Sequence, residues 1–145
     1  MRPAITSFSG EHRFLSNFWP ARVVFEGQQF ASTENAYQAA KTIDSQERNL
    51  FLECSPGQAK RMSRKIHLRS DWENIKLGVM LDLVRQKFVT GQDAPVLGPM
   101  LLATADNLLI EGNTWNDRFW GECPIGVGEN NLGKILMQVR MELKS

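Results

Sequence analysis

The sequence contains few of the residues that build a metal centre or a disulfide framework. Its 145 residues include two cysteines, Cys54 and Cys123, and two histidines, His12 and His67. The spacing of these four residues matches no zinc motif, so we expect neither a bound metal nor a cofactor. The two cysteines could form one disulfide, but we expect reduced thiols because the sequence shows no export signal.

Long apolar runs and an excess of charge of one sign are also absent. No stretch of about eighteen apolar residues occurs, so no membrane-spanning helix and no membrane partner are expected. The first residues lack the apolar core of a secretory signal, which predicts a cytoplasmic protein. The formal net charge of +1 gives no global attraction for nucleic acid, although a local basic site is compatible with it.

The length and composition are those of one folded domain. The chain is 42% hydrophobic and 23% charged, and it shows no internal repeat, low-complexity segment or linker. We therefore expect one domain over residues 1–145. The oligomeric state is left open.

Periodicity and capping signals predict a mainly α-helical, α+β domain with a small antiparallel sheet. The first thirty residues look extended, and segments 22–26 and 108–111 are the two strand candidates for the sheet. Helix starts are predicted at Ser32 or Thr33, Asp44, Ser55, Ser70, Asp93 and Leu132. The first helix is expected to end near residue 43, and the longest is expected to be largely buried over residues 71–89.

The first of these helices carries polar residues that are candidates for chemistry. Glu34, Gln38 and Lys41 follow one another at helical spacing and share one face. A solvated face with a weak ion pair would explain the same pattern.

A second candidate segment, residues 111–121, has neither helical nor strand periodicity. It combines two carboxylates, two asparagines and two tryptophans, a composition typical of a binding loop. The alternative is an irregular loop that its aromatic rings fix to the core.

Two further features have ordinary explanations that are equally good or better. The glycine-rich segment 126–133 precedes the last helix and could present N–H groups to a phosphate, or could form a turn and helix cap. The basic residues between Lys60 and Arg69 could recognise a phosphate on a small substrate, but an exposed helix face is the better interpretation.

Taken together, these segments resemble the YbiA-like N-glycosidase family of the NADAR superfamily. The resemblance covers nearly the whole chain in order, and only 122–127 has no clear match. The matching segments are 14–20, 25–27, 34–41, 71–72, 87–88, 109–113, 115–117, 120–121, 128–133 and 136–140.

The resemblance implies a mostly helical fold and cleavage of a sugar–base N-glycosidic bond. The family's YbiA-like members act on ribosylamino-pyrimidine phosphates of early riboflavin biosynthesis, and other members are associated with ADP-ribose, including its removal from guanine in nucleic acid. A small phosphoribosyl-pyrimidine is therefore the expected substrate, and ADP-ribosylated nucleic acid is the alternative. A nucleotide-binding module without catalysis, or a purely structural domain, is also left open.

Transferred through the matching motifs, the resemblance places Glu34, Trp72, Asp117 and Trp120 in the pocket, with Lys41 and Asn17 near it. We further expect Trp115, Gly121 and Asn130 to contact the substrate.

The chemistry of the reaction suggests roles for these residues. Cleavage of a glycosidic C–N bond gives the sugar oxocarbenium character, which a carboxylate stabilises. Our hypothesis is that Glu34 activates water or stabilises the cation, and that Asp117 holds the ribose or assists proton transfer. Trp72 or Trp120 would stack on the base. In a rival mechanism, Lys41 takes over the opened sugar as a Schiff base.

Overall fold

The computed structural model describes residues 3–145. The elements, in chain order, are β1 (Ala4–Ile5), a 3₁₀ helix η1 (Gly10–Leu15), β2 (Pro20–Phe25), β3 (Gln28–Ser32), α1 (Thr33–Ala39), α2 (Ser45–Asn49), α3 (Pro56–Met62), a 3₁₀ turn η2 (Ser63–Lys65), α4 (Trp72–Arg85), a π-helical turn η3 (Gln86–Thr90), α5 (Ala94–Leu102), β4 (Leu108–Leu109) and α6 (Asn131–Leu143). The predicted class, mainly helical with a small antiparallel sheet, is confirmed.

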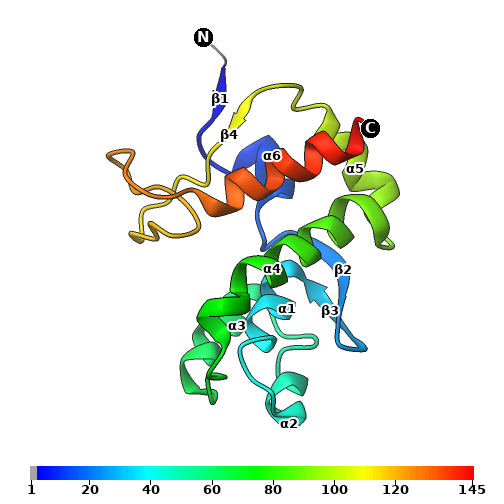
Figure 1. Cartoon of the computed structure of the whole chain (residues 1–145), viewed down its shortest axis with the longest axis vertical. Coiled ribbons are helices and arrows are strands. Elements are labelled where there is room, and N and C mark those ends of the chain that lie inside the picture. The colour runs from blue at the N-terminus through cyan, green and yellow to red at the C-terminus, as the bar shows by residue number, and fades with distance from the viewer. Residues whose placement is uncertain (1–2) are drawn as a thin grey trace.

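Helix α4 runs through the middle of the molecule, between α6 on one side and α1 and α3 on the other (Figure 1). Met80, Leu83 and Val84 bury its inner face in one hydrophobic core that includes residues of β2, α1, α5 and α6. The expectation that this helix is largely buried holds only for that face, because Leu77 is 47% exposed.

The antiparallel sheet is a hairpin of β2 and β3. The predicted strand at 22–26 is confirmed, but its partner is the next strand in sequence. Glu26 and Gly27 have φ angles of 46° and 85°, the conformation of a tight turn that matches the twist of the flanking strands.

The second predicted strand pairs differently from our expectation. Leu108–Leu109 forms a parallel pair with Ala4–Ile5, not an antiparallel pair with 22–26. The first thirty residues are also less extended than expected, because Gly10–Leu15 is a 3₁₀ helix. Strand pairing depends on contacts remote in sequence, so propensity alone does not determine the partner.

Three predicted helix caps are confirmed. The Ser32 side chain accepts from Asn35 N, that of Asp44 accepts from Gln46 N, and Ser55 forms a full capping box with Gln58. The first helix ends at Ala39, four residues before the predicted end.

Two other predicted caps are wrong in detail. Asp71, not Ser70, precedes α4 and makes no capping hydrogen bond, and the α-helix changes to a π-turn after Arg85. Asp93 does precede α5, but its carboxylate accepts from Arg22 of β2 through the backbone N and the guanidinium. An ion pair with another element thus replaces the predicted local cap.

Candidate active site

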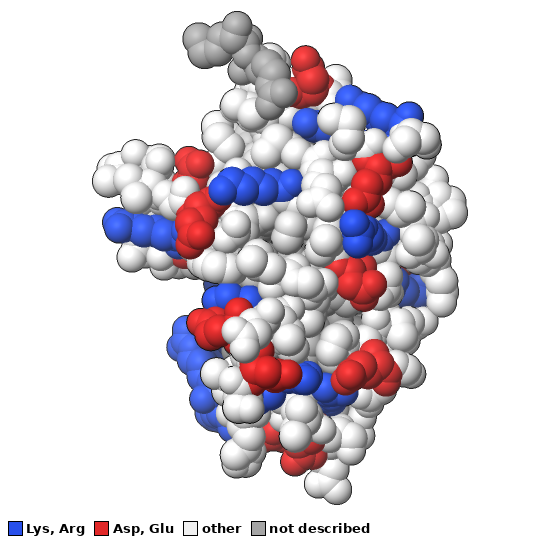
Figure 2. All heavy atoms as spheres, in the orientation of Figure 1, with Lys and Arg blue, Asp and Glu red and all other residues white. Residues whose placement is uncertain are grey.

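A hollow lies between the long connection of residues 110–130 and the helices α3 and α4. Figure 2 shows this indentation on the left edge of the molecule, below the lobe that the connection forms in Figure 1. Two lysines of the helices contact aromatic rings of the connection. Lys60 Nζ of α3 lies 4.7 Å from the ring centroid of Trp115, and Lys76 Nζ of α4 lies 3.9 Å from that of Phe119. Both contacts have the geometry of cation–π interactions.

Glu34 lies in the first turn of α1 and interacts electrostatically with Lys60 of this region. The Ser32 cap starts the helix, and Glu34 N donates to the carbonyl oxygen of Asn17 at 3.0 Å. The Glu34 side chain is buried, and Gln38 Nε2, one helical turn later, donates to its Oε2 at 2.6 Å. The alternative of a solvated face is therefore wrong for Glu34 and Gln38, which are both buried.

Burial raises the pKa of Glu34, because water no longer solvates its charged form. The hydrogen bond from Gln38 and the positive charges of Lys60 and Lys41 oppose this increase, while Asp117 adds to it. Glu34, Lys41, Lys60 and Asp117 are thus close enough to interact electrostatically, although they come from three separate segments of the chain.

Gln38 presents an unused acceptor beside Glu34. Its Oε1 is buried and has no hydrogen-bond partner among the described residues. A buried carbonyl without a partner is costly, so a nearby hydroxyl or water would be favoured as its donor.

An aromatic cluster forms the next layer of the site. The Tyr37 ring of α1 lies 5.1 Å from that of Trp72 and 5.4 Å from that of Trp120, measured between centroids. Trp120 Nε1 donates to the Tyr37 hydroxyl at 3.1 Å, so the indole has a fixed orientation. Trp72 is only 5% exposed and leaves little ring surface for stacking, whereas Trp120 is half-buried.

Lys41 lies just beyond the end of α1, with Nζ 5.4 Å from the centroid of the Tyr37 ring. Burial lowers the pKa of this lysine, and the negative charge of Glu34 opposes that effect. A lowered pKa increases the fraction of neutral amine, which is the nucleophilic form.

The segment that carries Asp117 is folded by its own polar side chains. Asn113 accepts from Asp117 N at 2.9 Å and donates to Asp117 O at 2.9 Å. Asp117 Oδ1 accepts from the backbone N–H groups of Phe119 and Trp120. The asparagine and the aspartate therefore shape the turn that places Trp120.

Glu111 is a third carboxylate in the same cluster. Asn113 Nδ2 donates to its Oε2 at 2.9 Å. Burial raises the pKa of Glu111 to about 7; Asp117 and Glu34 contribute to the increase, and the Asn113 hydrogen bond and Lys60 oppose it. Three carboxylates and two lysines thus share one electrostatic environment.

The remaining predicted site residues have mainly structural contacts. Asn17 Nδ2 donates to Met80 Sδ at 3.6 Å. Asn130 uses both ends of its side-chain amide on backbone, accepting from Glu111 N and donating to Leu109 O. A Cβ at Gly121 would collide with Glu111, so this glycine permits close packing. Trp115 is 58% exposed, with a face over Lys60.

The glycine-rich segment 126–133 forms a turn and helix start, as the simpler of its two interpretations predicts. Gly128 packs against the Gly121 carbonyl, and Gly133 packs against that of Leu109. Asn130 precedes α6 with a φ of 52°. No feature of this packing requires a phosphate.

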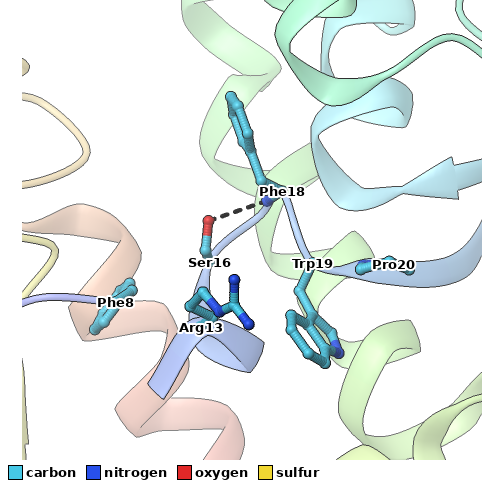
Figure 3. A pocket seen from close by; sticks show the side chains of 6 residues that line it. All are labelled: Phe8, Arg13, Ser16, Phe18, Trp19 and Pro20. Atoms are coloured by element: carbon cyan, nitrogen blue, oxygen red, sulfur yellow. Dashed lines mark hydrogen bonds between the residues drawn. The ribbon is translucent and has the colours of Figure 1, made fainter. Parts of the chain in front are cut away.

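A separate shallow pocket of ≈ 330 Å³ lies beside the 3₁₀ helix η1 (Figure 3). Its lining residues are Phe8, Arg13, Ser16, Phe18, Trp19 and Pro20. None of the three predicted catalytic residues lines it. Two of its lining residues, Ser16 and Phe18, flank Asn17, whose carbonyl accepts from Glu34 N.

Sequence reasoning missed four participants in the cluster: Tyr37, Lys60, Glu111 and Asn113. Lys60 was grouped with an exposed basic face, but its Nζ lies over the Trp115 ring and its charge lowers the pKa of Glu34. The spacing of Glu111 and Asn113, two residues apart beside Asp117, was the available signal, since short polar side chains so placed bond within a turn.

Residues 6–144 match the model of the NADAR domain family. The chain belongs to this family. It is 37% identical to N-glycosidase YbiA of Escherichia coli, over 94% of the chain and 85% of that protein. It is also 43% identical to a riboflavin biosynthesis protein of Vibrio vulnificus, over 92% of the chain but only 36% of that longer protein.

The fold of this NADAR domain also matches a solved structure. The NMR structure of E. coli YbiA superposes with a TM-score of 0.79 at 35% identity, covering 99% of this chain and 87% of that one. The predicted resemblance to YbiA-like proteins is confirmed.

Within residues 3–145, no group of three or more His, Cys, Asp or Glu side chains is arranged to hold a metal ion. No helix in the same range has the length and apolar character to cross a membrane. Cys54 and Cys123 are both free thiols.

Proposed function

We propose that this NADAR domain hydrolyses the C–N bond between ribose 5-phosphate and the base of a ribosylamino-pyrimidine phosphate. The enzyme class, a hydrolase of N-glycosyl bonds, is that of the relatives named N-glycosidase YbiA. The observation that carries the proposal is the buried Glu34 carboxylate, which shares its electrostatic environment with Asp117 and Lys41.

Glu34 has the surroundings of a group that acts on the anomeric carbon. As the oxocarbenium ion develops, a carboxylate out of contact with bulk water stabilises it more strongly than an exposed one does. The unused Oε1 of Gln38 supports the same role, because it can accept a hydrogen bond from the attacking water or a ribose hydroxyl. Trp120 would stack on the base, with its indole held by Tyr37.

The test is mass-spectrometric detection of ribose 5-phosphate after the full chain is mixed with freshly made ribosylamino-pyrimidine phosphate. We expect release by the wild type and a decrease in kcat of at least about 100-fold in Glu34→Gln, with a smaller change in KM. Glu11→Gln is the matched control, because the Glu11 side chain is 86% exposed and outside the cluster.

The outcomes separate the candidate functions. Unchanged turnover in Glu34→Gln would remove Glu34 from the mechanism. Wild-type protein that releases no ribose 5-phosphate would overturn the proposed substrate, and ADP-ribosylated guanine would be tested next. Binding of either compound without cleavage would indicate a binding module.

Lys41 offers a second route to the same products. A ribosylamine can open its ring, and an amine with a lowered pKa can then attack the exposed C1′ as a nucleophile. Borohydride added during turnover traps a sugar on Lys41 if this route operates. Turnover with no adduct on Lys41 would exclude it.

A further inference from the structure

The three carboxylates of the cluster differ in how their oxygens are occupied. Asp117 Oδ1 accepts two backbone hydrogen bonds, and Glu34 Oε2 accepts one from the side chain of Gln38. Glu111 accepts one side-chain hydrogen bond, from Asn113, and forms no ion pair within the described range. Asp117 is therefore committed to a turn, whereas Glu34 and Glu111 each accept one side-chain hydrogen bond and form no ion pair within residues 3–145, so these two are the pair available for separate acid and base roles.

The backbone of Glu111 is nevertheless rigidly held. Its N–H donates to Asn130 Oδ1 at 3.0 Å, and its carbonyl accepts from Glu122 N at 2.9 Å. Gly121 packs directly against its carbonyl and its Oε2, since a Cβ there would collide with both atoms. Such support fixes a side chain before substrate arrives, as a catalytic acid requires.

The surroundings of Glu111 also favour its protonated form. Half-burial and the neighbouring charges of Asp117 and Glu34 raise the pKa to about 7, against the opposing Asn113 hydrogen bond and Lys60. A group with such a pKa carries a proton in much of the protein at neutral pH and can still release it. Two carboxylates with different environments are the usual basis for separate acid and base roles.

We propose that Glu111 is the catalytic acid, protonating the nitrogen that leaves the sugar. This role rests on the proposed function. The C1′–N bond breaks with its electron pair moving to nitrogen, and nitrogen takes the proton from the Glu111 carboxyl. Water forms the new C1′–O bond and gives a proton to the Glu34 carboxylate. Together these steps add one water across the C1′–N bond; Glu34 then gives its proton to solvent and Glu111 takes one from solvent, which restores both groups.

The experiment compares two leaving groups on the same sugar. One substrate is the ribosylamino-pyrimidine phosphate, whose amine must be protonated to depart. The other is 4-nitrophenyl riboside 5-phosphate, whose nitrophenolate departs without a proton. We expect Glu111→Gln to lower kcat/KM on the first by about 100-fold or more and on the second by less than about tenfold. Glu129→Gln, an exposed carboxylate on the same connection, should match the wild type on both.

The pH profile provides a second readout that also works if Glu111→Gln fails to fold. On the first substrate, wild-type kcat/KM should fall as the pH rises through about 7, because the acid loses its proton. That decline should be absent on the nitrophenyl substrate.

This role would be overturned if Glu111→Gln lowered kcat/KM equally on both substrates, or did not lower it on the first. Either result would leave the proposed N-glycosidase activity intact. The same alkaline decline on both substrates would also overturn this role. Wild-type protein inactive on both substrates would instead overturn the proposed function, and with it this role.

Discussion

At the scale of residues, the site depends on side chains that act on the backbone as well as on substrate. Asp117 illustrates both roles, because one carboxylate oxygen accepts from Phe119 N and Trp120 N. An asparagine retains such an acceptor and loses only the charge, whereas an alanine loses both. The two substitutions therefore separate the structural role of Asp117 from its electrostatic role.

We expect Asp117→Asn to lower turnover by at least about tenfold, since it removes a negative charge from the region of the developing cation. Its free energy of unfolding should stay within about 0.5 kcal/mol of the wild type. Asp117→Ala should lose activity too, and should also lose about 1 kcal/mol of stability, as helix-capping side chains do when truncated. Urea unfolding and steady-state kinetics measure the two quantities. Equal stability of both variants would show that the turn does not depend on this carboxylate.

How much of the site could be predicted depended on whether a residue's role was local. Glu34 follows a recognisable cap and belongs to a familiar motif, so its position was accessible from sequence. Glu111 was visible as a carboxylate, but Gly121, which packs against it, and Asn130, which accepts from its backbone N–H, are ten and nineteen residues away in sequence. Lys60 was assigned to a solvated face because periodicity gives no information on which neighbour covers a helix.

At the scale of elements, the same distinction separates caps from pairings. The capping box at Ser55 is a local pattern, and it forms as the sequence predicts. The pairing of β4 with β1 brings together segments about one hundred residues apart, and no local pattern specifies it. The π-turn after Arg85 was equally inaccessible: there Gly91 N donates to Gln86 O, five residues back, in the hydrogen-bond pattern of a π-helix.

Two helical glycines should respond to alanine in opposite directions. Gly78 is exposed in α4, and a Cβ there would meet no atom within 4 Å. Gly78→Ala should therefore stabilise the protein by about 0.5–1 kcal/mol, through helix propensity. Gly133 is buried in the first turn of α6, where a Cβ would collide with Leu109 O and the Asn130 amide.

Gly133→Ala should accordingly destabilise the protein by about 1–3 kcal/mol, the usual range for overpacking. Urea unfolding of both variants measures the contrast. Because Asn130 also binds Glu111 N, activity in Gly133→Ala should fall along with stability. A stable, fully active Gly133→Ala would show that the contact between α6 and β4 is looser than the structure indicates.

At the scale of the whole molecule, the least expected feature is a buried lysine. Lys87 lies in the π-turn, is 1% exposed, and donates to Ser16 O at 2.8 Å. Burial lowers its pKa from 10.5 to about 7. No carboxylate compensates for its charge among the described residues, since desolvation is the cause of the shift and its printed contacts are Ser16 O and the Phe88 ring. Sequence alone suggested only a family motif at this position.

Because of the buried lysine, the free energy of unfolding should vary with pH in the neutral to alkaline range. Between about pH 7 and 10.5 the unfolded chain keeps the Lys87 proton and the folded chain releases it. Because the unfolded state then binds more protons, the free energy of unfolding rises with pH, by up to about 1.4 kcal/mol per pH unit for one such group. The contribution is lost as the pH falls back towards 7.

Lys87→Met should remove this dependence, so wild type should gain stability relative to the variant as the pH rises from about 7.5 to 9.5. Taking the difference between the two proteins cancels the contribution of every titrating group that they share. Lys134→Met, on an exposed position of α6, should give no such divergence. Urea unfolding at several pH values measures the slopes. Parallel curves for wild type and Lys87→Met would mean that Lys87 keeps its proton in the folded protein, and that its hydrogen bond to Ser16 compensates for burial of the charge.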